Sequence, residues 1–202
     1  MSQCIVIGKA NVGKTLFVLN FTNFLGISEP MLDFDYADGK QHRQAFTTHN
    51  AILELTSEKA HHTLGLQHMD VTLPGVKGQK QFTLTDTCGL AQGIHGEALI
   101  RRAMAQTIAA LQGAKIILHM MDAHHVANSE NLGELGEVDW EIAQYGGTRS
   151  GYGILANKMD LIDAGKGLLK IRKEFPLQAV IPISALQKRG FREVKHFVWR
   201  HL

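Results

Sequence analysis

The sequence contains no run of apolar residues approaching the roughly 18 that a membrane-spanning helix needs. It also has only two cysteines in 202 residues, Cys4 and Cys88. A chain of this length can build a sufficient hydrophobic core without disulfides, so we expect two free thiols. The net charge of +2 lacks the basic excess that a general nucleic-acid binder carries, so an RNA contact would need a local patch.

Marks of targeting are absent as well. The first residues form no basic segment with an apolar stretch and a cleavage site, and Ser2 stands where myristoylation requires glycine. We therefore expect a cytoplasmic protein without a membrane span. Because the chain ends at Leu202, directly after the last expected helix, we expect a single domain over residues 1–202 with no appended RNA-binding domain.

Hydrophobic periodicity alternates between strand and helix along the chain. Strands are predicted at 3–7, 68–73, 81–85, 115–121, 151–156 and 179–183, and helices at 13–24, 98–111, 132–143, 164–175 and 191–201. This order predicts an α/β fold: a six-stranded, mostly parallel sheet with helices on both faces and one antiparallel edge, from a hairpin with a loop at 74–78. Residues 26–58 fit no regular pattern and are interpreted as an insertion.

A phosphate-binding loop follows the first strand. Gly8 to Thr15 reads GKANVGKT, which satisfies G-x-x-x-x-G-K-[ST] between a strand and a helix. The two glycines let backbone N–H groups and the positive end of the helix face a phosphate. Lys14 is expected to contact the β- and γ-phosphates, and the Thr15 hydroxyl to bind Mg²⁺.

Three further segments select among the classes of P-loop protein. Residues 157–160 read NKMD after a buried strand, where the Asp160 carboxylate can accept both N–H donors of guanine. Asn157 is expected to brace this segment against the phosphate loop, and the Lys158 stem to cover the purine face. Residues 184–186 read SAL after the last strand, so that the Ala185 N–H can donate to guanine O6.

The segment 86–89 reads DTCG and fits D-x-x-G at the end of a strand. Asp86 is expected to reach Mg²⁺ through water, and the Gly89 N–H to sense the γ-phosphate. Thr63 is the candidate for the threonine that completes the magnesium shell; the alternative is an ordinary surface threonine.

With these motifs in this order, the chain resembles the Era-like GTPases of the translation-factor-related class, which include Era, EngA and TrmE. The resemblance implies a P-loop NTPase G domain that binds GTP or GDP with Mg²⁺ and hydrolyses GTP slowly as a molecular switch. It also implies two switch loops, one around Thr63 and one over residues 86–96. It further implies a ribosome- or RNA-associated partner, and it leaves a nucleotide-dependent dimer open. The expected nucleotide contacts are Gly8, Asn11, Val12, Gly13, Lys14, Thr15, Leu16, Asp86, Gly89, Asn157, Lys158, Asp160, Ser184, Ala185 and Leu186. The expected catalytic residues are Asn11, Lys14, Thr63 and Gly89.

The sequence departs from that family at several points. Ala10 and Cys88 replace two family prolines, and the interval between Lys14 and Asp86 is long. Leu90 stands where Ras-type proteins carry the glutamine that orients water. The resemblance therefore implies that Asn11 helps to coordinate K⁺ as a charge-stabilising cation, the alternative being a charge supplied by a partner protein.

Two readings of function remain: an enzyme that cycles GTP to GDP, or a nucleotide-gated binding module with negligible hydrolysis. The histidine pairs 61–62 and 124–125 lack metal-ligand spacing and are interpreted as solvated or hydrogen-bonded. His61, His62 and His95 flank the expected switch loops. The basic residues of the closing helix are interpreted as a solvated face rather than an RNA-contacting strip.

Overall fold

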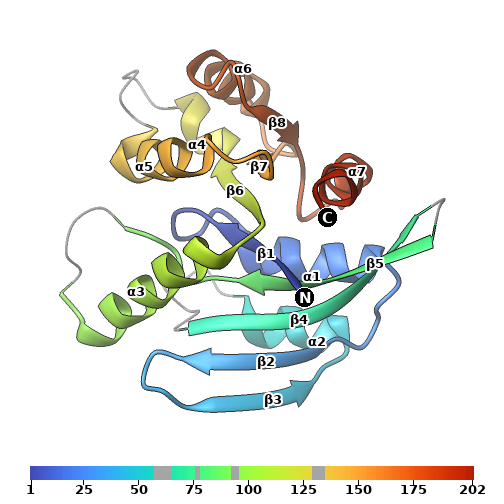
Figure 1. The fold of residues 1–202 in the computed structure, drawn as a ribbon. Helices are drawn as coiled ribbons and strands as arrows, with labels where there is room; N and C mark the ends of the chain where they lie inside the picture. Colours follow the sequence, from blue (N-terminus) through green and yellow to red (C-terminus); the bar gives the residue numbers. More distant parts are fainter. Residues whose placement is uncertain (57–64, 76–77, 92–95, 129–134) are drawn as a thin grey trace.

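The computed structural model describes residues 1–56, 65–75, 78–91, 96–128 and 135–202. A single eight-stranded sheet with the order β3-β2-β4-β5-β1-β6-β7-β8 runs through it (Figure 1). Its strands are β1 (Ser2–Ile7), β2 (Met31–Tyr36), β3 (Gln41–Ala45), β4 (Gly65–Gly75), β5 (Gly78–Asp86), β6 (Ile116–Asp122), β7 (Tyr152–Asn157) and β8 (Ala179–Pro182). The helices are α1 (Lys14–Phe24), α2 (Thr48–Leu55), α3 (Ala98–Gly113), α4 (Ala123–Asn128), α5 (Gly136–Gly146), α6 (Ala164–Glu174) and α7 (Phe191–His201).

The prediction of a six-stranded, mostly parallel sheet is wrong in number and direction, although the α/β class is confirmed. β1 pairs in parallel with β5 and β6, and β7 pairs in parallel with β6 and β8. The pairs β4–β5, β2–β4 and β2–β3 are antiparallel, so the sheet is mixed.

The two additional strands come from the stretch 26–58, which the sequence pattern left unassigned. In β2, Leu32 and Phe34 are buried while Asp33 and Asp35 between them are partly exposed, which is the alternation of a half-buried strand. β3 forms the edge of the sheet and is exposed at every position. These strands extend the sheet beyond β4 and explain its antiparallel half.

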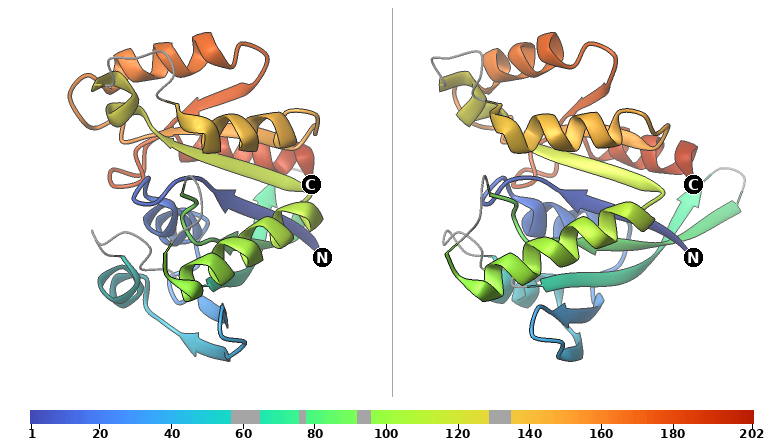
Figure 2. Two further views of the ribbon diagram at one scale, coloured as in Figure 1. Left: turned by 90° about the vertical axis from the view of Figure 1, so that its left-hand side faces the viewer. Right: turned by 60° about the vertical axis from the view of Figure 1, so that its left-hand side comes forward.

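The helices lie in two layers, one on each face of the sheet (Figure 2). Successive residues of β1 supply both cores: Cys4 and Val6 belong to the cluster with α1, α2 and α7, while Ile5 and Ile7 belong to the cluster with α3, α4, α5 and α6. This alternation follows from the two-residue period of a strand buried on both faces.

The carboxyl ends of five strands meet at one edge of the sheet. β1 lies between β5 and β6 and is parallel to both. After β1 the chain continues towards the β2, β4 and β5 side of the sheet, whereas after β6 it continues towards β7 and β8 on the other side. Such a switch point in an open α/β sheet forms a crevice where ligands bind. The loops that follow Ile7, Asp86, Asp122, Asn157 and Pro182 all begin at this edge.

The hairpin turn, the two cysteines and the helix lengths were also predicted from the sequence. β4 and β5 pair as far as Gly75 and Gly78, so the hairpin turn is shorter than the predicted loop, with residues 76–77 outside the described part. Cys4 and Cys88 are buried free thiols. No helix within the described ranges is both long and apolar enough to cross a membrane.

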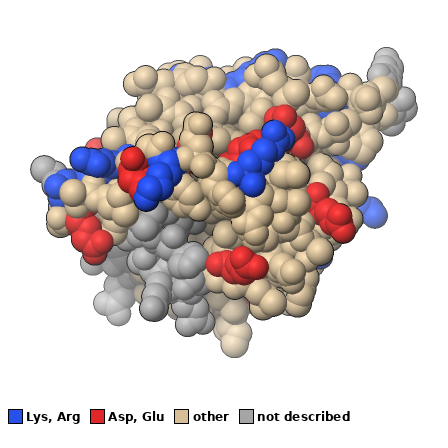
Figure 3. Space-filling model, turned by 90° about the horizontal axis from the view of Figure 1, so that it is seen from below, with Lys and Arg blue, Asp and Glu red and all other residues tan. Residues whose placement is uncertain are grey.

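Charge is mixed on the face seen from below in Figure 1, the side on which β3 lies. Figure 3 shows basic and acidic side chains interspersed there, without a large area of one sign. This face gives no support to an extended basic surface.

Candidate functional site

The phosphate loop lies between β1 and α1, at the carboxyl edge of the sheet. Gly13 has a left-handed φ of 96° and immediately precedes the first residue of α1, Lys14. A Cβ at Gly13 would lie 2.6 Å from the Asn157 amide nitrogen, so both the backbone angle and the space require glycine. Asn11 also has a positive φ, of 60°, which asparagine tolerates better than most residues. The loop therefore directs the N-terminus of α1 at the space where an anion would bind.

Lys14 is buried above this loop. Its ammonium donates to the carbonyl oxygens of Lys9 at 2.7 Å and Gly8 at 3.2 Å. Burial lowers the pKa of Lys14 to about 8, and the nearby Asp86 carboxylate opposes that shift. An anion beside the ammonium would favour its charged form, so the site is electrostatically suited to phosphate.

Thr15 and Asp86 form a pair of oxygen ligands beside Lys14. The Thr15 hydroxyl donates to Asp86 Oδ2 at 2.6 Å, and the Thr87 N–H donates to Asp86 Oδ1 at 3.0 Å. Asp86 is fully buried, and burial raises its pKa to about 6 against the lowering effect of Thr15 and Lys14. A hydroxyl and a carboxylate in this position fit the oxygen preference of Mg²⁺.

Several residues of the predicted switch loops lie outside the described part of the chain. Thr63, the candidate third magnesium ligand, lies outside the described residues with His61 and His62, and so does His95. The other predicted switch begins within the described part. Its Gly89 packs against Ala10, where a Cβ would lie 2.5 Å from the Ala10 Cα.

Leu90 ties this switch to the phosphate loop. Its N–H donates to the Gly8 carbonyl at 3.1 Å, and its side chain is buried in the core on the α3 face. A buried leucine at this position cannot orient water, as the sequence suggests.

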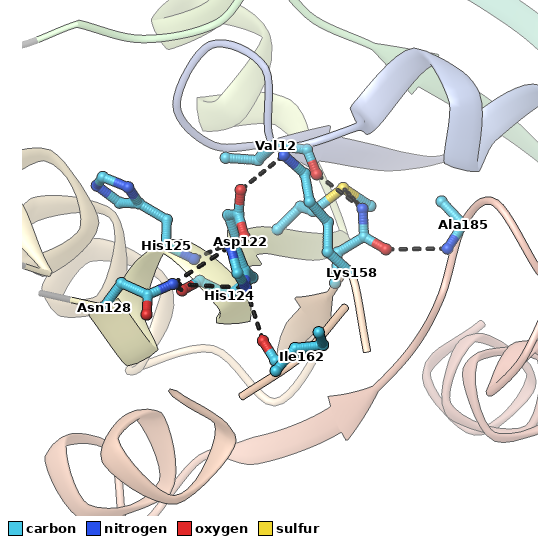
Figure 4. Close-up of polar contacts among 10 residues, drawn as sticks. Val12, Asp122, His124, His125, Asn128, Lys158, Ile162 and Ala185 are labelled. Carbon is cyan, nitrogen blue, oxygen red and sulfur yellow. Dashed lines mark hydrogen bonds and ion pairs between the residues drawn. The ribbon is translucent and has the colours of Figure 1, made fainter. Parts of the chain in front are cut away.

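Asn157 joins the expected base-binding segments to the phosphate loop through Val12 and Ala185, which are labelled in Figure 4. Its Nδ2 donates to the Val12 carbonyl at 2.7 Å, and its Oδ1 accepts from the Ala185 N–H at 2.9 Å. Asn20 supports the same segment from α1, donating to the Ala185 carbonyl at 2.9 Å. The expected brace to the phosphate loop is therefore present, and Asn20 is a supporting residue that the motifs did not reveal.

Two of the expected base contacts are arranged differently from the prediction. The Ala185 N–H, predicted to donate to guanine O6, donates to Asn157 in this structure, and Ala185 is buried. Ser184 donates through its hydroxyl to Asp160 Oδ1 at 2.5 Å, so its side chain orients the carboxylate. Leu186 is 66% exposed beside them, and is the member of the triplet that is open to a ligand.

Lys158 forms an ion pair that the sequence did not predict. Its ammonium lies 2.6 Å from Asp122 Oδ2, and Asp122 Oδ1 accepts the His125 N–H at 3.0 Å (Figure 4). Asp122 is the last residue of β6, and an acidic residue at the end of a mostly apolar strand was the signal in the sequence. The pair fixes the Lys158 side chain, whose stem was expected to cover the purine.

Three other residues named in the sequence analysis have side chains that are buried, partly buried or hydrogen-bonded. Val12 is buried in the core beneath the loop, and Leu16 packs partly buried against the same core. His124 Nδ1 contacts the Ile162 carbonyl at 2.7 Å, which agrees with its interpretation as a hydrogen-bonded residue. Among the described residues no group of three or more His, Cys, Asp or Glu side chains is arranged to hold a metal ion.

Fold and loop geometry together define a P-loop nucleotide-binding domain. The chain belongs to the family described as 50S ribosome-binding GTPases, which matches residues 3–158. No curated protein matches the sequence.

Solved structures share the fold at low sequence identity. A variant of Era from Aquifex aeolicus bound to GDP and AlF4⁻ aligns with a TM-score of 0.71 and 22% identity, covering 99% of this chain and 56% of that chain. Era in complex with MgGDPNP and nucleotides 1506–1542 of 16S ribosomal RNA aligns with a TM-score of 0.69 and 22% identity, over 100% of this chain and 56% of that chain. The FeoB G-domain from Methanococcus jannaschii aligns with a TM-score of 0.58 and 18% identity, over 100% and 98%. The chain thus spans little more than half the length of the Era chains, and these likenesses support the fold of the Era-like class alone.

Proposed function

We propose that this protein binds GTP and GDP with Mg²⁺ and hydrolyses GTP to GDP and phosphate as a molecular switch. The observation that carries the proposal is the double hydrogen bond of Asn157. It links the phosphate loop at Val12 with the segment that contains Ser184 and Ala185, and Ser184 in turn orients Asp160. A phosphate site and a guanine-reading carboxylate are thereby held in one rigid frame.

The proposed chemistry rests on positioning and charge. The N–H groups of the phosphate loop and the N-terminus of α1 bind phosphate oxygens, while Lys14 neutralises charge on the β- and γ-phosphates. Thr15 and Asp86 would hold Mg²⁺, which would neutralise charge on the phosphates. Gly89 places its N–H beside the loop, where it can respond to the γ-phosphate.

Other roles stay predictions. Thr63 is proposed to complete the magnesium shell, and Asn11 to contribute to a K⁺ site. Residues 26–58 are proposed to be an insertion in the G domain. Because the family is described as ribosome-binding and one Era neighbour is bound to 16S ribosomal RNA, we propose a ribosome- or RNA-associated partner.

Calorimetry with GTP, GDP and ATP in the presence of Mg²⁺ tests nucleotide binding. We expect tight binding of both guanine nucleotides, weak binding of ATP, and a loss of a few kcal/mol in Lys14→Ala because a charge-assisted contact to two phosphates is removed. Equal affinity for ATP and GTP would contradict the base-reading role of Asp160.

Phosphate release under multiple turnover tests hydrolysis separately. We expect slow turnover of GTP that is abolished in Lys14→Ala. Tight GTP binding without release, in either sodium or potassium, would instead support the nucleotide-gated binding module.

A further inference from the structure

A buried chain of polar contacts leads from the phosphate loop to α5, and the nucleotide site described above does not use it. Lys9 Nζ lies 2.7 Å from Asp139 Oδ2 and donates to the Leu135 carbonyl at 2.6 Å. Asp139 Oδ1 is 3.1 Å from His119 Nε2, and His119 Nδ1 is 2.8 Å from the Tyr152 hydroxyl. These four side chains come from the phosphate loop, α5, β6 and β7.

The inner members of this chain are almost inaccessible to water. His119 is 0% exposed, Tyr152 3% and Asp139 4%. Burial raises the pKa of Tyr152, so its hydroxyl stays protonated and can donate to His119 Nδ1. His119 can then donate from Nε2 to Asp139, which leaves the second carboxylate oxygen for Lys9. Every contact in this order has one donor and one acceptor, so the carboxylate is held in a single orientation.

The Lys9 ammonium lies at the N-terminus of α5, where the Asp139 carboxylate contributes to making a cation favourable. The ammonium contacts Leu135, the residue before α5, and Asp139 lies in the first turn of that helix. The N-terminus of a helix carries partial positive charge and repels a cation. Without the Asp139 charge, the Lys9 side chain would therefore tend to leave α5.

The backbone of Lys9 connects this pair to the phosphate site. Its carbonyl oxygen accepts a hydrogen bond from the Lys14 ammonium at 2.7 Å. The neighbouring Gly8 carbonyl accepts both from Lys14 and from the Leu90 N–H. A displacement of Lys9 would thus move the acceptors that orient Lys14 and the start of the switch at Leu90.

We propose that Asp139 is a positioning residue of the phosphate loop: by holding the Lys9 side chain against α5, it fixes the carbonyl oxygens that place the Lys14 ammonium. This inference rests on the proposed function, because its readout is nucleotide affinity. Together with Leu90, α5 would then connect the helix layer formed by α3, α4, α5 and α6 to the phosphate site.

The test compares single and double variants by GDP and GTP affinity, together with free energy of unfolding. Lys9→Met removes the ammonium and Asp139→Asn removes its partner; each should weaken both nucleotides about tenfold, which corresponds to about 1.4 kcal/mol. The double variant should lose little more than either single variant, because both act through one contact. Lys9→Arg keeps the ion pair and should retain the affinity within about twofold.

Glu141→Gln is the matched control, since it removes the same charge from an exposed position of the same helix. It should leave nucleotide affinity unchanged. If Asp139→Asn fails to fold, the comparison of Lys9→Met with Lys9→Arg carries the test.

The outcomes separate this inference from the proposed function. If the wild-type protein binds no guanine nucleotide, the proposed function is wrong. If the wild type binds GDP and a folded Asp139→Asn binds it equally well, the positioning role is wrong and the proposed function stands. Losses that add fully in the double variant would likewise overturn the coupling between Lys9 and Asp139.

Discussion

The Lys158 ammonium lies 2.6 Å from the Asp122 carboxylate, joining the end of β7 to the end of β6. Asp122 is mostly buried and Lys158 is about one-third exposed, so solvent screens the pair only in part. Lys158 also adopts a left-handed backbone conformation, with φ of 66°. The ion pair with Asp122 fixes the Lys158 side chain, whose position does not follow from the local sequence.

Asp122→Asn should therefore weaken GDP binding without unfolding the protein. The amide keeps the acceptor for the His125 N–H but loses the charge that holds Lys158. We expect a loss of about 1 kcal/mol, or roughly fivefold in the dissociation constant, by calorimetry. Asp163→Asn is the control because it removes an exposed ion pair with Lys166 at the start of α6. An equal loss in both variants would contradict a specific role for Asp122.

Asp160→Asn should shift base preference from guanine towards xanthine. The amide donates where the carboxylate accepts, and xanthine carries a carbonyl at C2. Competition binding with GTP, XTP and ATP measures the change.

Ser184→Ala is the matched comparison for that experiment, because it removes the hydroxyl that orients Asp160 and leaves the carboxylate itself as a hydrogen-bond acceptor. It should weaken GTP binding and gain nothing for XTP. A gain of XTP affinity in Ser184→Ala would count against reading of the base by Asp160.

Asp86 should make the nucleotide-free protein less stable as pH rises through its folded pKa. Burial raises that pKa from 3.8 to about 6, so the native state holds the proton more tightly than the unfolded state. Stability contributed by the neutral carboxyl is present at low pH and is lost as the group ionises. Relative to Asp86→Asn, the wild type should lose about 1–1.5 kcal/mol of unfolding free energy between about pH 5 and about pH 7.5. A pH-independent difference between the two proteins would show that burial does not penalise the Asp86 charge.

Asn11 should make GTP turnover respond to potassium. Phosphoryl transfer needs a cation near the developing charge, an effect of roughly 10³–10⁵ in rate when an arginine supplies it, and Leu90 cannot order the water. Replacement of sodium by potassium at constant ionic strength should raise turnover severalfold.

The structure determines the best variant for this test. Because Asn11 has φ of 60°, alanine would add backbone strain, whereas Asn11→Gly removes the side chain at a conformation that glycine accepts. Asn11→Gly should abolish the potassium response and keep GDP affinity. Equal rates in sodium and potassium for the wild type would favour a charge supplied by a partner protein.

Most elements with a strong hydrophobic period could be predicted from the sequence. The predicted closing helix at 191–201 coincides with α7, and the strands predicted at 3–7 and 151–156 lie within one residue of β1 and β7. Four elements, β2, β3, α2 and α4, were missed for physical reasons. β2 buries only Leu32 and Phe34, which is too short an alternation to stand out in the sequence. β3 buries no side chain and so shows no alternation, α2 buries only Ala51, and the six residues of α4 are too few to show a helical period.

Contiguous motifs by themselves determined the kind of site. The GKANVGKT loop and the NKMD segment each carry their chemistry within a few neighbouring residues, so backbone geometry and functional groups can be read together. Together with the DTCG segment at 86–89, they predicted Lys14, Thr15, Asp86 and Asp160 as site residues.

Tertiary structure alone decided which of these groups support one another. Asn157 meets Val12, Asp122 meets Lys158, and Asp139 meets Lys9 because the strand order places β1 between β5 and β6 and puts β7 beside β6. These contacts join residues far apart in the chain, and the sequence predicted only the brace from Asn157 to the phosphate loop, not the ion pairs of Lys158 and Lys9. They form because the burial of both sheet faces fixes the strand order, and the strand order in turn fixes which loop ends are neighbours at the carboxyl edge.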